Sequence, residues 1–94
     1  MISKTLLSST YGKLRDDYYF VDFFTVFTDA TLKLSKGEFI DTALTLAKLV
    51  WHDRKKRRAT LSEVHYLHRV SQMYFQLDEV KDGEKWDART HTIV

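Results

Sequence analysis

The four histidines are the first residues to consider, because imidazole serves both as a metal ligand and as an acid or base near neutral pH. His65 and His68 are three residues apart and would share a helix face, whereas His52 and His91 have no spacing relation to them. Tetrahedral zinc takes three or four protein ligands, and the chain has no cysteine to complete such a set. We therefore expect no metal and no cofactor, and a structural or surface role for the histidines.

Other catalytic patterns are absent from the sequence. Glycine occurs only at positions 12, 37 and 83, so no glycine-rich loop can hold a phosphate. No serine lies in a nucleophile elbow. Asp16 and Asp17 are adjacent and would point to different sides of a helix, as residues at a helix start do. These observations favour a protein that is not an enzyme.

One spacing resembles that of a ribonuclease family. Arg58 and His65 have six residues between them, which is similar to the Arg-x4-6-His motif of all-helical HEPN ribonucleases. In that family the pair forms a composite site across a dimer, so the resemblance implies a helical nuclease that uses these two residues. The residue after the arginine is typically polar in the family and is Ala59 here. We rank this interpretation below two binding functions.

The charges are unevenly distributed along the chain. The net charge is only +2, yet residues 48–69 carry seven basic and two acidic side chains. A positive field of this kind attracts phosphate groups or an acidic protein surface. The alternative is a solvated helix end, because cations suit the C-terminus of a helix. The basic run that would make the contacts consists of Arg54, Lys55, Lys56, Arg57 and Arg58.

Aromatic residues gather near the N-terminus, where seven of the thirteen lie between positions 11 and 27. Four phenylalanines have helical spacing and predict one buried stripe: Phe20, Phe23, Phe24 and Phe27. Tyr18, Tyr19 and Val26 lie off this stripe, and such side chains are enriched in protein interfaces. They are our candidates for contacts with a protein partner or with a second copy in a homodimer.

The absence of proline and the scarcity of glycine favour long helices. We predict helices over about 3–13 and 16–34, a third from Ser35 into the basic run, and a fourth from Thr60 toward Val80. Asp16 or Asp17 would cap the second helix, although a strand over 18–28 is an alternative for that aromatic, β-branched segment. Ser35 to Glu38 and Thr60 to Glu63 have the form of capping boxes.

The expected fold is all-α, with about four helices in a small bundle or orthogonal array. The fourth helix carries a predicted apolar stripe that begins at Leu61, and Gly83 is its expected stop. Residues 1–83 would form the single domain, and residues 84–94 a short irregular tail without helical period.

The segment 60–77 resembles a helix-turn-helix motif. Residues 61–67 would be the supporting helix, 69–72 the turn, and 73–80 the recognition helix. In this interpretation Gln72 and Gln76 would contact base edges while the basic run binds phosphates. Four positions depart from the residues that the motif prefers. One uninterrupted helix fits the same apolar spacing.

Two functions follow, from different classes. The first is a non-enzymatic binding protein that modulates or inhibits a larger protein partner. The alternative is a nucleic-acid-binding regulator that uses the basic run and segment 60–77. The chain lacks cysteine, a signal peptide and an apolar run of membrane-spanning length, so we expect a cytoplasmic protein without a membrane partner. A short chain of this composition is typical of phage- or plasmid-borne accessory proteins.

Overall fold

Five helices make up the part of the chain that the structure, a computed structural model, describes: residues 4–16 and 22–93. They are α1 (Lys4–Arg15), α2 (Phe23–Ala30), α3 (Lys36–Asp53), α4 (Leu61–Gln76) and α5 (Val80–Thr92). No strand occurs among these residues, so the all-α prediction is confirmed. None of the five helices is long and apolar enough to cross a membrane.

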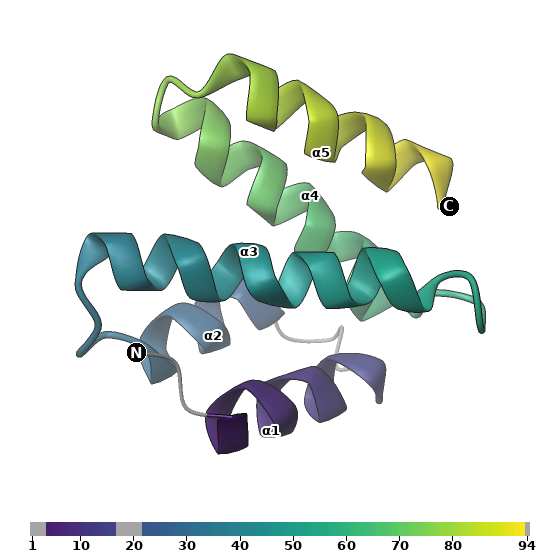
Figure 1. Cartoon of the computed structure of the whole chain (residues 1–94), viewed down its shortest axis with the longest axis horizontal. Coiled ribbons are helices and arrows are strands. Elements are labelled where there is room, and N and C mark those ends of the chain that lie inside the picture. The colour runs from purple at the N-terminus through teal and green to yellow at the C-terminus, as the bar shows by residue number, and fades with distance from the viewer. Residues whose placement is uncertain (1–3, 17–21, 94) are drawn as a thin grey trace.

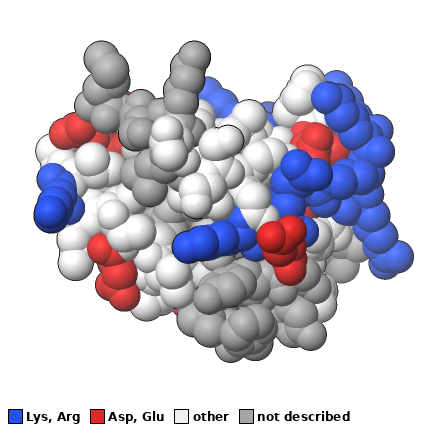
Figure 2. Space-filling view, turned by 90° about the horizontal axis from the view of Figure 1, so that it is seen from below, with Lys and Arg blue, Asp and Glu red and all other residues white. Residues whose placement is uncertain are grey.

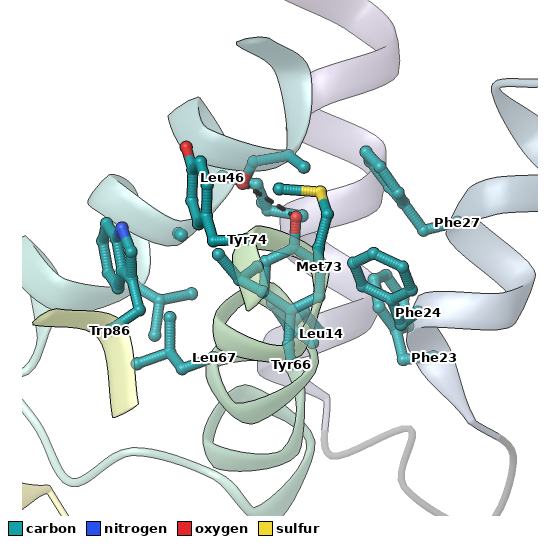
Figure 3. Packing of buried hydrophobic residues seen from close by; sticks show 14 residues of the cluster. Leu14, Phe23, Phe24, Phe27, Leu46, Tyr66, Leu67, Met73, Tyr74 and Trp86 are labelled. Carbon is teal, nitrogen blue, oxygen red and sulfur yellow. Dashed lines mark hydrogen bonds between the residues drawn. The ribbon is translucent and has the colours of Figure 1, made fainter. Parts of the chain in front are cut away.

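Helix α4 holds the fold together, because it packs against each of the other four helices. α5 runs back along α4 as an antiparallel partner, while α1 and α2 lie on the side of the molecule away from α5 (Figure 1). The buried side chains from all five helices form one core (Figure 3). Its largest fully buried members are Trp86, Tyr66 and Phe23. The Tyr66 hydroxyl donates a hydrogen bond of 2.9 Å to the Ala43 carbonyl, so this buried polar group is satisfied.

Both predicted capping boxes are present. The Ser35 hydroxyl accepts from the Glu38 N–H at 3.2 Å, and the Thr60 hydroxyl accepts from the Glu63 N–H at 3.1 Å. In each box the glutamate reaches back to the backbone of the capping residue. The starts of α3 and α4 are therefore determined by local sequence, since each box satisfies N–H groups that lack partners within the helix.

The predicted second helix over 16–34 is too long. α2 has eight residues and is capped by Asp22, whose side chain accepts from the Phe24 N–H at 3.1 Å. Asp16 instead belongs to the turn that ends α1, where its N–H donates to the Gly12 carbonyl, and Asp17 lies outside the described residues. Phe23, Phe24 and Phe27 are buried as predicted, whereas Phe20 lies outside the described residues.

The helix-turn-helix prediction is wrong, because segment 61–76 is one uninterrupted helix. Leu61, which we placed on the buried stripe, is 61% exposed at its first turn. α4 ends at Gln76 and not near Val80. The turn passes through Asp78 with a left-handed φ of 62°, a conformation that aspartate tolerates better than most residues.

In place of the expected stop at Gly83 and irregular tail, the chain folds back as α5. This helix has few apolar residues, so the sequence pattern did not reveal it, yet Gly83, Trp86 and Thr90 are buried on one helical face. Gly83 lies inside α5, where a Cβ would come within 2.8 Å of the Phe75 ring on α4. The glycine therefore permits the two helices to approach closely.

We expect Gly83→Ala to destabilise the protein by about 1–3 kcal/mol, because the added methyl group overlaps a ring in contact with α5. Thermal and denaturant unfolding would measure the loss. Gly37→Ala is the matched control, since a Cβ at that exposed helical position meets nothing within 4 Å. The control should be neutral or stabilising, by up to about 1 kcal/mol. Equal unfolding curves for the two variants would contradict the close approach of α4 and α5.

Candidate functional site

The connection between α3 and α4 carries the basic run at one end of the molecule. Lys and Arg side chains gather at that end (right side of Figure 2). Lys55, Lys56 and Arg58 are exposed, whereas Arg54 and Arg57 are partly buried. Three consecutive turn hydrogen bonds, from the N–H groups of residues 54, 55 and 56, continue the last turn of α3 into the run. The cations thus stand on a defined backbone.

Arg57 links the two ends of this connection through ion pairs. Its Nε lies 2.8 Å from Oδ2 of Asp53, and its two terminal nitrogens donate to the two carboxylate oxygens of Glu63 at 3.0 and 2.8 Å. Nη1 also donates to the Arg58 carbonyl at 3.0 Å. The Glu63 carboxylate is the main cause of the raised pKa of Arg57. The guanidinium joins the end of α3 to the start of α4, so we assign it to positioning the loop.

The end of α1 is fastened to the same connection. The Thr60 hydroxyl donates to the Leu14 carbonyl at 3.0 Å while it caps α4. Burial is the main cause that raises the pKa of Tyr11 to about 12, and the Asp53 carboxylate adds to the shift. In return, the Tyr11 hydroxyl is the main cause of the lowered pKa of Asp53, with Arg57 and Arg15 contributing. The exposed Arg15 thereby joins the positive end of the molecule.

The ring of Trp51, in the last turns of α3, contacts two guanidinium groups. Arg54 lies 3.6 Å from the centre of the Trp51 ring, and its Nη1 donates to the Trp51 carbonyl at 2.7 Å. Arg89, from α5, lies 4.8 Å from the same ring and 4.7 Å from the Trp86 ring. These cation–π contacts fix the direction of Arg54 and bring the end of α5 to the connection.

An open pocket of about 260 Å³ lies between the connection and the end of α5. It is lined by Arg54, Arg57, Arg58, Ala59, Thr92 and Ile93. Three of the five predicted cations therefore line one concave surface, whereas Lys55 and Lys56 are not among its lining residues.

The two glutamines of the alternative hypothesis lie elsewhere. From Thr60 to Gln76 the helix rises about 24 Å, at roughly 1.5 Å per residue. Gln72 and Gln76 are exposed and line a second pocket, of about 170 Å³, together with Phe24, Phe39 and Met73. This pocket, whose lining also includes Thr28 and Arg69, contains no residue of the basic run, so the structure does not bring the predicted base contacts and phosphate contacts together.

The aromatic interface candidates are only partly placed. Tyr18 and Tyr19 lie outside the described residues, and Val26 is half-buried on α2. Arg58 lines the basic pocket, but His65 is not among the lining residues and instead faces Asp22, with 3.8 Å between Nδ1 and Oδ1. The spacing that resembles the ribonuclease motif therefore does not place both residues at one pocket.

Seven members of the site were missed at the sequence level: Trp51, Asp53, Ala59, Glu63, Arg89, Thr92 and Ile93. Asp53 and Arg57 have the i, i+4 spacing of a helical ion pair, and the Thr60 box already fixes Glu63 at the start of α4, so those two patterns could have revealed the network. No local pattern predicts that Arg89 and Ile93 reach the connection, because α5 arrives there only through packing on α4.

The whole chain was compared with known proteins. It matches no family model, no curated protein and no solved structure. Among residues 4–16 and 22–93, no group of three His, Asp or Glu side chains could hold a metal ion.

Proposed function

We propose that the protein is a non-enzymatic binding protein that docks on an acidic surface of a larger protein partner and modulates or inhibits it. The observation that carries this proposal is the set of three exposed, neighbouring cations on a connection with a defined backbone: Lys55, Lys56 and Arg58. Because the backbone that carries these cations is ordered before binding, less conformational freedom is lost when the partner docks, which favours affinity.

The arrangement supports a protein partner over nucleic acid. The cations occupy one end of the molecule, and the pocket beside them has apolar walls from Ala59 and Ile93. Specific protein interfaces combine apolar contact area with a charged rim. A nucleic-acid surface more often extends along the phosphate backbone, and the glutamines that would contact bases lie along the far half of α4.

We expect the triple variant Lys55→Gln/Lys56→Gln/Arg58→Gln to weaken partner binding by about 2 kcal/mol or more, which is the scale of an interface hot spot. Affinity capture from host lysate, with and without nuclease, would compare it with the parent protein. A matched control removes the same charge at three other exposed lysines: Lys33→Gln/Lys48→Gln/Lys81→Gln.

The parent and the control should retain one protein after nuclease treatment, and the triple variant should lose it. Elution should require less salt as charges are removed, since exposed ion pairs are screened. Equal capture by the triple variant and the control would exclude the connection as the docking surface.

Nucleic-acid binding is the second candidate, and the same exposed cations favour it. Because Arg57 is held by Asp53 and Glu63, the other four cations of the run remain for phosphate contacts, which predicts a log–log salt slope of about −3.6. Fluorescence anisotropy on duplex and single-stranded DNA at ~50 mM salt would measure it. A flat salt response, or no binding at that salt, would remove this candidate. Loss of the captured protein after nuclease treatment would favour it over the protein partner.

A further inference from the structure

The pocket of about 260 Å³ between the α3–α4 connection and the end of α5 extends the proposed function, on which this inference rests. The exposed lysines explain attraction to an acidic surface, but they do not line the pocket. Arg54 and Arg58 do, and their neighbours in the lining are Ala59, Thr92 and Ile93. The lining therefore combines guanidinium groups with apolar side chains.

The Arg54 side chain and the Arg58 backbone are positioned before any ligand arrives. Arg54 lies against the Trp51 ring at 3.6 Å, and its described contacts use one of its five N–H donors. The Arg58 carbonyl is held by Nη1 of Arg57, which Asp53 and Glu63 fix in turn. Arg57 also lines the pocket, but its guanidinium already serves two carboxylates. Arg54 and Arg58 are therefore the donors available to an incoming acceptor.

The local charge favours an anion. Seven cations and two carboxylates meet at this end of the molecule, for a net charge of +5: Arg15, Arg54, Lys55, Lys56, Arg57, Arg58 and Arg89 against Asp53 and Glu63. The C-terminal end of α5 faces the pocket through Thr92 and Ile93 and carries only about half a negative charge. The field in the pocket is therefore positive.

We propose that the pocket receives one acidic side chain of the partner, an aspartate or a glutamate. Its carboxylate pairs with the guanidinium groups of Arg54 and Arg58, whose planar forks match carboxylate geometry. Its methylene stem packs against Ala59 and Ile93, which line the same pocket. The mixed lining distinguishes this ligand from a bare inorganic anion, which has no apolar part.

The test titrates the ¹⁵N-labelled protein with a short capped peptide that carries one glutamate between glycine and serine residues. Backbone amide signals of Ala59, Thr60 and Ile93 and the Trp51 indole signal should shift and saturate. The pocket variant Arg54→Gln/Arg58→Gln should weaken the affinity about tenfold, which corresponds to one lost charge-assisted pair. The variant Lys55→Gln/Lys56→Gln loses the same charge outside the pocket lining and should weaken it less than about threefold.

Equal losses in the two variants, or no saturable shift at these signals, would overturn the inference. A phosphoserine peptide bound about tenfold more tightly than the glutamate peptide would overturn the choice of a carboxylate. Arg58→Gln alone, at an exposed residue, covers the case in which the Arg54 variant fails to fold. If the variant Lys55→Gln/Lys56→Gln, which leaves the pocket lining intact, loses the full partner in the capture experiment while the peptide leaves the pocket signals unmoved, the pocket inference fails and the proposed docking surface stands.

Discussion

Phe23→Ala should lower the free energy of unfolding by about 3–5 kcal/mol, because it removes a buried ring from the centre of the core. Phe23 is 2% exposed, and its ring meets the ring of Tyr66 edge to face, with 6.0 Å between the centroids. The loss is a large share of the ~5–15 kcal/mol that a domain of this size holds. Denaturant unfolding followed by circular dichroism would measure it.

Val26→Ala is the control on the same helix. Val26 is half-buried, so its truncation should cost no more than about 1 kcal/mol. If Phe23→Ala does not fold, Phe23→Leu keeps most of the volume and should still cost about 1–2 kcal/mol. A Phe23→Ala loss as small as that of Val26→Ala would contradict the packing of α2 on α4. A Val26→Ala variant that keeps its stability but loses the partner would instead extend the docking surface to α2.

Glu63→Gln should destabilise the protein by about 2–3 kcal/mol, since it removes the buried partner of Arg57 and leaves the guanidinium paired with Asp53 alone. The Glu63 side chain is 2% exposed and holds Arg57 through both oxygens. The same carboxylate accepts from the Thr60 N–H at 2.8 Å. The Arg57 side chain is 28% exposed, and its contact with water limits the loss of stability. Thermal and denaturant unfolding near neutral pH would measure the effect.

A double-mutant cycle with Arg57→Gln separates the pair from its neighbours. Because both charges are then removed, the double variant should be less destabilised than the sum of the two single variants. Glu38→Gln is the matched control, because Glu38 has the same position in the capping box of α3. The hydrogen bonds of that box are exposed to solvent, so the variant should lose about 1 kcal/mol of stability or less. Additive losses of stability in the cycle would show that the Arg57–Glu63 ion pair does not stabilise the connection.

The sequence determined the features that depend on neighbours within one helical turn. The all-α class, the starts of α3 and α4 and the burial of Phe23, Phe24 and Phe27 followed from spacing and capping chemistry. Each of these involves residues three or four positions apart, so the pattern is visible along the chain. The contiguous basic run was equally visible, because charges that adjoin in sequence stay close in any fold.

Tertiary structure decided the features that join distant segments. α5 is polar, and the burial of Trp86, with Gly83 admitting the Phe75 ring from α4, stabilises a helix in the segment expected to be a tail. α2 begins at Phe23 with Asp22 as its cap, and Asp16, the expected cap, lies in the turn that ends α1. Isolated helices of such length are marginal in water, so packing selects where they begin and end.

Tertiary structure also determined which cations of the basic run are paired within the protein and which are exposed. Five adjacent cations look alike in the sequence, but folding gives them different surroundings. Arg57 meets Asp53 and Glu63, Arg54 meets Trp51, and the lysines remain exposed. The charge of each residue is set by its own side chain and could be known in advance. Whether that charge is neutralised inside the protein or offered to a partner depends on carboxylates and rings that only the packing of α3, α4 and α5 brings within a few ångströms.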